Sequence, residues 1–521
     1  MIRLSAGAMA RRIAAGELSS SELVEAHIAR IEEVNPRLNA VVIERFAAAR
    51  AEAAAADAAC ARDEKLPPFH GVPITVKECF HLAGTPATEG VHHFAGEICT
   101  VDNPLVARLR AAGAIVLGKT NLPQLMLTHE TDNPVYGRTN NPWDLARGPG
   151  GSSGGEAAII AAGGSPLGLA NDIGGSIRHP SHSCGVCGLK PTTLRLTNAL
   201  VRDNLRGMEA IRPACGPIAR NVDDLSLAMR VLVDGDPRSI DPQIAPVPLG
   251  DPNDIDIAGL KVGFWSDDGF FPASPALRRA VDEAAIALEC LGARVERFQP
   301  PDFDEAVRLF FALLSADGGA DAERILDRSP RDWRVRRLIM LCKSPRWLRG
   351  LANVPLRWAG QQRTAFLLAA IGRRNTDAYW QLSAVRANYA EQFFGRWSAA
   401  GLDVLICPPH SLPALKHGST GDLPLSGSYG YWANVLGVPS GVVPVTRVRL
   451  GEEGDRPASR DLVDRAAMAV EQGSVGLPVG VQVAARPWRE DVALAVMKAL
   501  ETHFRPLADY PRTPIEPQAS K

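Results

Sequence analysis

The sequence predicts a single large α/β domain, residues 1–521, built around one buried β-sheet. Short apolar runs that are typical of buried strands recur along the chain, and segments with helical periodicity separate them. The chain has 521 residues, of which 46% are hydrophobic, so it can bury a large core. This length would allow about three domains, but large α/β enzymes often fold as one.

The N-terminal half supplies the first elements of this pattern. Ser19 and Glu22 have the spacing of a capping box, and Val24, Ile28 and Ile31 then form one apolar stripe of a helix. Further helices are expected over residues 44–62, which are rich in alanine, 104–112 and 156–162. Strands are expected between and after them, over residues 72–76, 114–118 and 167–171.

The C-terminal half continues the alternation. Ser274 and Pro275 resemble an N-cap and a first-turn proline, which predicts a helix through Leu291. Four more strands are expected over residues 295–298, 404–407, 441–446 and 479–483, and a closing helix over residues 492–500. The Pro- and Asp-rich residues 235–256 are expected to form a surface connection, and the charged residues 451–474 an exposed excursion.

Charge and cysteine content exclude several classes of protein. The formal net charge is −1, so no overall field attracts nucleic acid, and we expect no nucleic-acid partner. Nine scattered cysteines do not suggest a secreted disulfide framework. Cys184 and Cys187 form one CxxC pair without a second pair at zinc-ligand spacing, so buried thiols are expected. The N-terminus has no signal-peptide or membrane-spanning pattern, which predicts a cytoplasmic protein.

One segment, residues 331–374, is strongly basic. It contains eleven Lys or Arg residues and a single acidic residue, Asp332. Trp347, Leu351 and Trp358 recur at helical spacing, although Pro355 is expected to break or kink a helix there. Such a stretch can lie on the surface of an anionic membrane as a peripheral contact. The alternative is a solvated helical face whose tryptophans fill a groove of the same protein.

Two glycine loops that each carry serine predict the chemistry. One loop holds Ser152, and the other holds Ser176, 24 residues later, after Ile173, Gly174 and Gly175. The backbone amides of Ile173, Gly174, Gly175 and Ser176 can converge on one carbonyl oxygen, because glycines leave room around them. Losing a single donor of such an oxyanion hole typically costs about 3–4 kcal/mol. Ser176 therefore suits the role of nucleophile.

A serine nucleophile needs a base, and Lys77 is the best candidate. Burial and neighbouring donors can lower the pKa of a lysine, so that its neutral amine accepts a proton. No histidine nearby in the sequence has a partnering motif or a metal-ligand spacing with a carboxylate, and we expect no metal and no cofactor. These histidines are expected to be structural or at the surface: His70, His92, His93, His129, His179 and His182.

The pattern Gly-x-Ser-x-Gly around Ser153 also matches the nucleophile elbow of α/β-hydrolases. That motif needs a strand immediately before it, and residues 139–149 have the composition of a loop, so we reject this interpretation.

The two loops belong to a longer pattern that resembles the amidase signature. The matching segments are residues 150–156, 164–168, 172–178 and 187–192, with further matches at residues 119–123, 216–220 and 476–482. The resemblance covers nearly the whole chain. It implies a mixed, twisted β-sheet covered by helices on both faces, with a signature core at about residues 66–235.

The resemblance also implies a Ser–cis-Ser–Lys triad. Ser176 matches the nucleophile, Ser152 the serine that follows a cis peptide bond, and Lys77 the base. Ser152 would relay the proton of Ser176 to Lys77 and then deliver it to the leaving amine, and Ser153 would support this network.

Within the family, the chain looks most similar to the fatty acid amide hydrolases. Glu78 follows Lys77 where many members carry Asp, and residues 139–143 and 164–168 also fit. Residues 331–374 fall where those enzymes carry a membrane-facing helical cap. Asn171 departs from the family, in which Thr is common, and Arg178 is expected to be structural.

We therefore expect an amidase that cleaves amides of long apolar acyl chains through an acyl-enzyme. The alternatives are a glutamine-hydrolysing amidotransferase subunit, an aryl or short-chain acylamidase and, outside enzymes, an inactive binding or scaffold protein. The filled triad positions argue against the last. A homodimer and a peripheral contact with the inner membrane surface are left open.

Overall fold

One mixed β-sheet organises the computed structural model, which describes residues 1–60, 66–202, 205, 207–235 and 241–519. In these residues, eleven strands pair in the order β1-β3-β2-β6-β8-β7-β12-β13-β11-β9-β10. In that order, the strands are Val41–Glu44, Ile115–Thr120, Pro73–Lys77, Leu167–Asp172, Ala214–Ala219, Cys187–Lys190, Ser440–Arg447, Pro478–Ala485, Val404–Cys407, Lys261–Phe264 and Arg294–Arg297.

Strand direction varies across this sheet. The strands β2, β3 and β6 are parallel to one another, as are β9, β10 and β11, while the pairs between β6 and β11 are antiparallel. The central strands are buried along their whole length, which is why they read as continuous apolar runs in the sequence.

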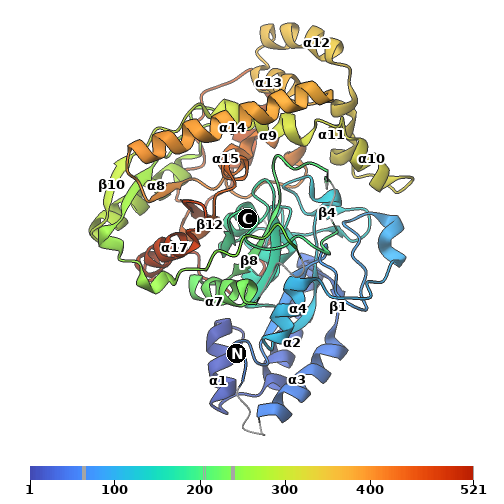
Figure 1. The fold of residues 1–521 in the computed structure, drawn as a ribbon, viewed down its shortest axis with the longest axis vertical. Coiled ribbons are helices and arrows are strands. Elements are labelled where there is room, and N and C mark those ends of the chain that lie inside the picture. The colour runs from blue at the N-terminus through green and yellow to red at the C-terminus, as the bar shows by residue number, and fades with distance from the viewer. Residues whose placement is uncertain (61–65, 203–204, 206, 236–240, 520–521) are drawn as a thin grey trace.

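Helices cover both faces of the sheet (Figure 1). One face packs against α2, α3, α5 and α6, which are Ser20–Leu38, Phe46–Cys60, Gly154–Ala162 and Arg178–Cys184. The other packs against α4, α7, α8 and α17, which are Pro104–Ala111, Val222–Val233, Pro275–Cys290 and Glu490–Phe504. The helix α1, Ala6–Ala14, contacts α7. The predicted single α/β domain with helices on both faces is confirmed.

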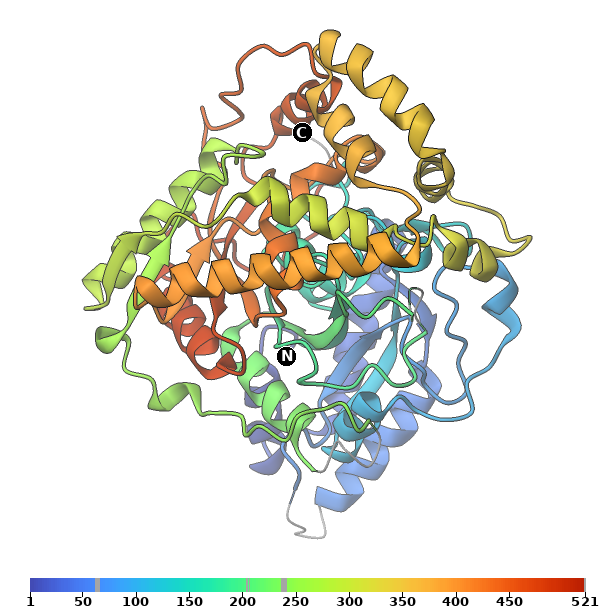
Figure 2. The same cartoon turned by 45° about the horizontal axis from the view of Figure 1, so that its top comes forward.

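The helices that lie between β10 and β12 in the sequence form a layer over the C-terminal half of the chain (Figures 1 and 2). The long α14, Thr376–Ala399, crosses it together with α9, Phe303–Leu314, and α15, Ser428–Leu436. The outermost helices are α10, Ala320–Leu326, α11, Trp333–Lys343, α12, Arg346–Trp358, and α13, Gln362–Ala370.

Most predicted elements form with shifts of one or two residues at their ends. The Ser19 capping box is present. Ser274 precedes α8 as expected, but its hydroxyl bonds Glu471 and the Ser411 carbonyl rather than the helix end. Residues 61–62 of the predicted alanine-rich helix and residues 236–240 of the predicted surface connection lie outside the described residues.

One expectation was wrong. Residues 451–474 are not wholly an exposed excursion, because they include α16, Leu462–Glu471, which buries Val463, Ala467 and Val470 as a stripe at helical spacing. Pro355 was expected to break or kink a helix, and it does not break one, since α12 continues through it to Trp358. The proline removes only one helical hydrogen bond, and it does so close to the C-terminus on an exposed surface.

Candidate active site

Lys77 is the last residue of β2, an interior strand of the sheet, and is fully buried. Its Nζ donates to Ser152 Oγ at 2.6 Å and to Asn171 Oδ1 at 2.7 Å. Asn171 is within reach because β6 runs parallel to β2, with Val76 opposite Leu169. The sheet register therefore brings an amine, a hydroxyl and an amide oxygen together.

Ser152 lies in the loop that enters α5. The peptide bond between Gly151 and Ser152 is cis. A side chain at Gly151 would place its Cβ 2.6 Å from the Thr128 carbonyl oxygen, so only glycine fits there. Close packing of this loop against residues 128–129 holds Ser152 in place above Lys77.

Ser153 connects the first loop to the second. Its amide donates to the Ser176 carbonyl at 3.1 Å, and its hydroxyl donates to the Asn171 carbonyl at 3.3 Å. Ser153 precedes α5, but turns and isolated bridges occupy residues 139–152 before it. The strand that a nucleophile elbow requires is absent from this described stretch.

The second loop is held by a buried ion pair. Asp172 accepts from the amides of Gly175 and Ile177 at 2.8 and 3.0 Å, and it pairs with Arg178 at 3.0 Å. Burial raises the pKa of Asp172, but the charge and hydrogen bonds of Arg178 outweigh it and hold this pKa well below its ordinary value. Arg178 also donates to Gln482, so it has the structural role expected of it.

Four backbone amides were expected to form the oxyanion hole, and one of them already has a hydrogen-bond acceptor within the protein. The Gly175 amide is engaged by Asp172 Oδ1. Among the described residues, the amides of Ile173, Gly174 and Ser176 have no hydrogen-bond acceptor. They remain available for a substrate oxygen.

Glu156, which the sequence analysis missed, lies beneath the lysine. Its carboxyl group accepts from Thr120 Oγ1 at 2.5 Å and from Thr75 Oγ1. Burial is the largest influence and raises its pKa to about 7, against the opposing hydrogen bonds and the charge of Lys77. A Cβ at Gly168 would overlap Glu156 Oε1. The clue in the sequence is a lone carboxylate in a helix that is otherwise apolar all round.

A cluster of aromatic side chains packs against the second loop. A Cβ on Gly174 would lie 2.6 Å from Phe310 Cζ and 3.5 Å from Tyr431 Cε1. The rings of Phe310 and Tyr431 stack with centroids 4.1 Å apart, and Phe311 meets Tyr431 edge to face. Because these residues come from α9 and α15, far from the glycine loops in sequence, no local pattern could identify them.

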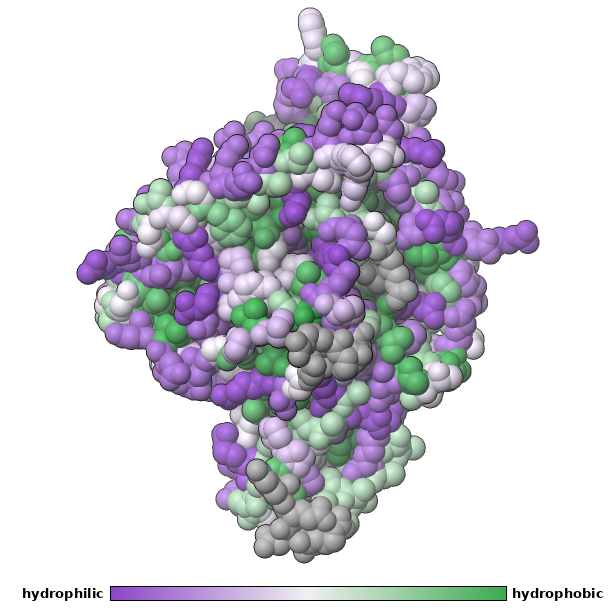
Figure 3. Space-filling view, viewed as in Figure 1, coloured by the Kyte–Doolittle hydropathy of each residue, from purple (hydrophilic) through white to green (hydrophobic). Residues whose placement is uncertain are grey.

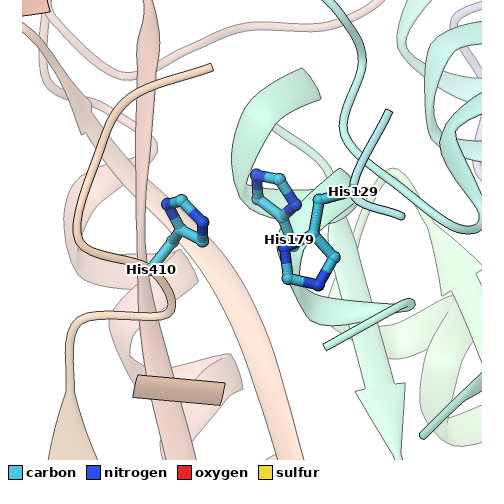
Figure 4. A group of neighbouring side chains, drawn as sticks. All are labelled: His129, His179 and His410. Atoms are coloured by element: carbon cyan, nitrogen blue, oxygen red, sulfur yellow. The ribbon is translucent and has the colours of Figure 1, made fainter. Parts of the chain in front are cut away.

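The histidines take different positions. His92 and His93 are exposed, and His70 bonds the Ala56 carbonyl. His129 and His179 come together with His410, a residue that the sequence analysis did not consider (Figure 4).

Three comparisons relate the chain to known proteins. The sequence profile of the amidase family matches residues 22–494. The chain is 34% identical to fatty-acid amide hydrolase 1 of Sus scrofa over 503 residues, 96% of this chain and 85% of that protein. It is 31% identical to a glutamyl-tRNA(Gln) amidotransferase subunit of Acidothermus cellulolyticus over 527 residues, 97% of this chain and 95% of that protein. A solved structure of fatty acid amide hydrolase superposes with a TM-score of 0.85 and 26% identity, covering 96% of this chain and 85% of that one.

Proposed function

The chain belongs to the amidase family and is an amide-hydrolysing enzyme, and from that premise we propose that it cleaves amides of long apolar acyl chains through an acyl-Ser176 intermediate. The observation that carries the proposal is the pair of short hydrogen bonds from Lys77 Nζ to Ser152 Oγ and Asn171 Oδ1. They link the base to a serine whose loop is bonded to the Ser176 carbonyl through Ser153.

In the proposed reaction, Ser176 Oγ attacks the amide carbonyl carbon while its proton passes to Ser152 Oγ, which gives its own proton to neutral Lys77. The C–N bond then breaks as the proton returns through Ser152 to the leaving nitrogen. Water attacks the acyl-enzyme by the same relay and releases the carboxylic acid. Ser153 supports the relay by fixing the positions of the two loops.

The charge that develops on the substrate oxygen would be stabilised by the amides of Ile173, Gly174 and Ser176. The fourth expected donor, Gly175, could contribute only by leaving Asp172. None of these steps uses a metal or a cofactor.

Two observations favour a long acyl chain. Phe310 and Tyr431 pack against Gly174, and Phe311 packs against Tyr431, so apolar side chains lie beside the loop from which an acyl chain would extend. The relatives named fatty-acid amide hydrolase match over most of their length.

The surface of α12 supports peripheral contact with lipid. Trp347, Leu351, Val354 and Trp358 share one helical face and are 66%, 66%, 60% and 87% exposed. The tryptophans therefore do not fill a groove in this chain. Pale and green side chains gather at this end of the molecule in Figure 3, next to hydrophilic ones. Among the described residues, no helix is long and apolar enough to cross a bilayer.

The experiment is hydrolysis of an amide series of increasing acyl length by the purified protein. We expect kcat/KM to rise with chain length, because each buried methylene contributes about 0.8 kcal/mol. A maximum at short or aryl acyl groups would favour the acylamidase alternative.

A second candidate, release of ammonia from glutamine for a partner, is supported by the similarity to the amidotransferase subunits. Glutaminase activity that appears only with added partner subunits would favour it over the fatty-acyl proposal.

A further inference from the structure

His129 lies between the two glycine loops of the candidate active site. It follows the short helix η2, Gln124–Met126, in a stretch of backbone that packs against Gly151. A side chain at Gly151 would place its Cβ 2.8 Å from the carbonyl carbon of His129 and 2.9 Å from its Cα. Two residues later, Thr131 Oγ1 donates to the Gly150 carbonyl at 2.8 Å. The backbone around His129 is therefore fixed to the first loop.

The side chain of His129 reaches the second loop. Its Nε2 is 3.0 Å from the Gly174 carbonyl oxygen, which can only accept, so Nε2 carries a proton and donates it. Burial lowers the pKa of His129, so the ring is neutral and this proton is its only one. The ring packs against that of His179, with centroids 4.7 Å apart (Figure 4), and a Cβ at Gly427 would lie 2.8 Å from His129 Cε1. Close packing therefore holds the ring in the orientation that donates to the loop.

The peptide group between Gly174 and Gly175 is held at both ends. Its carbonyl accepts from His129, and its amide donates to Asp172 Oδ1 at 2.8 Å. The C=O and N–H of a trans peptide point in opposite directions, so these two partners prevent its rotation. Glycine on both sides would otherwise leave that rotation easy. The amides of Gly174 and Ser176, which we propose bind the substrate oxygen, flank this peptide, so their directions depend on it.

A second link between the loops lies elsewhere. The Ser153 amide donates to the Ser176 carbonyl at 3.1 Å and fixes the end of the second loop. The bond from His129 fixes its middle, at Gly174. Both links are needed to set the position of Ser176 and the direction of the amides before it, because one bond alone leaves the loop free to pivot.

We infer that His129 is a positioning residue, which holds the middle of the second loop against the first so that the oxyanion-binding amides keep one direction. Such amides stabilise a developing negative charge strongly because they do not have to reorganise during the reaction. The inference rests on the proposed reaction at Ser176, but not on the length of the acyl chain. It requires only an N–H at the position of Nε2, so another side chain with that donor can replace the histidine.

The test is the rate at which a fluorophosphonate labels Ser176. Ser176 Oγ displaces fluoride from phosphorus, and the negative charge that develops on the phosphoryl oxygen is stabilised by the same amides. His129→Phe keeps a ring but removes the donor, and should lower the second-order rate constant about three- to tenfold, the loss expected for one neutral hydrogen bond. His129→Gln places an amide N–H where Nε2 lies and should restore most of the rate. A rate constant does not depend on the fraction of folded protein, so partial unfolding alone would not give this pattern.

His70 provides the matched control. Its Nε2 also lies 3.0 Å from a backbone carbonyl, that of Ala56 in α3, and His70→Phe should be labelled at the rate of the parent. If His129→Phe fails to fold by circular dichroism, the smaller His129→Leu gives the same comparison with His129→Gln.

The outcomes separate this inference from the proposed reaction. Equal rate constants for the parent, His129→Phe and His129→Gln would overturn the role of His129 and leave Ser176 as the nucleophile. Equal losses in His129→Phe and His129→Gln would also overturn it, because the N–H would then not matter. A parent protein that is not labelled at Ser176 would overturn the proposed reaction and this inference together.

Discussion

Asn171 Oδ1 accepts a hydrogen bond from Lys77 Nζ at 2.7 Å, across two neighbouring parallel strands. This bond orients the amine toward Ser152, 2.6 Å away. Asn171→Leu keeps the size of the side chain but removes the acceptor. We predict that it lowers kcat by about tenfold or more, because loss of a hydrogen bond to a charged group such as the lysine ammonium costs about 1.5–3 kcal/mol. KM should change little if the residue positions the lysine and does not touch substrate.

The pH profile separates this positioning role from a structural one. Asn171→Asp places a carboxylate beside the amine and favours its charged form, so the rise in activity should move to higher pH. Asn171→Thr, which restores an oxygen, should recover part of the rate. Equal losses in all three variants with an unshifted profile would assign Asn171 to folding alone.

Ser176→Ala should lower amide hydrolysis by up to roughly 10⁶-fold while the protein stays folded, by analogy with the loss of other serine nucleophiles. A fluorophosphonate should label Ser176 and no other serine, as peptide mass spectrometry can check. Ser153→Ala is the matched control, since its hydroxyl reaches only the Asn171 carbonyl at 3.3 Å, and it should cost far less. Labelling that persists in Ser176→Ala would move the nucleophile elsewhere.

Lys77→Ala should nearly abolish hydrolysis, and in the parent enzyme the rate should rise with pH as the neutral amine forms. His129→Ala and His70→Ala are the comparisons, because both histidines lie near in sequence but bond only backbone carbonyls in the structure. If either histidine variant removed the pH-dependent rise and Lys77→Ala kept it, a histidine would be the base.

Glu156 makes stability depend on pH. Burial raises the pKa of its carboxyl to about 7 from 4.5, so the folded protein holds this proton more tightly than the unfolded chain. The stabilisation is complete below about pH 4.5 and is lost as pH rises through 7, up to roughly 3 kcal/mol in all. Glu156→Gln cannot ionise, so its thermal midpoint should fall less than that of the parent between pH 5 and pH 8. Lys190, with a pKa lowered by burial to about 7, is common to both proteins and cancels in the difference. If the thermal midpoints of parent and variant changed equally between pH 5 and pH 8, Glu156 would not be the source of the pH dependence.

The sequence predicted the local elements that carry the candidate site. Apolar runs predicted the strands that carry Lys77 and Asn171, and the glycine loops indicated Ser152 and Ser176 as candidates. Contacts that depend on the packing of distant elements could not be predicted. Phe310, Tyr431 and His410 lie in segments without any motif. Only the packing of α9, α15 and the loop after β11 brings them to the second glycine loop.

Residues 451–474 show a different limit of the sequence. Their high charge led to the prediction of an exposed excursion. The apolar stripe of α16, formed by Val463, Ala467 and Val470, nevertheless decides how the segment packs.

The last prediction concerns α12 and lipid. At low salt, the protein should sediment with anionic vesicles and less with neutral ones, because each Lys or Arg near the surface contributes only about 1 kcal/mol and salt screens it. Burying Trp347 and Trp358 adds an apolar contribution of a few kcal/mol. Replacing both tryptophans by Ser should therefore reduce binding at every salt concentration. Replacing Arg346 and Arg357 by Glu should remove mainly the salt-sensitive part. Arg349 is unsuitable for this test, because it is buried and donates to the Ser344 carbonyl at 2.7 Å.

Trp380 on α14 provides the matched control for these variants. It is 72% exposed but lies outside the face formed by Trp347, Leu351, Val354 and Trp358, so Trp380→Ser should bind vesicles like the parent. Hydrolysis of a short, water-soluble amide should be unchanged in every α12 variant, whereas hydrolysis of a long-chain amide presented in anionic vesicles should fall with binding. If the protein sediments with no vesicle at any salt concentration, the exposed face must serve another contact. Light scattering of the parent and of the paired tryptophan variant would then test whether this face is a contact between two copies of the chain.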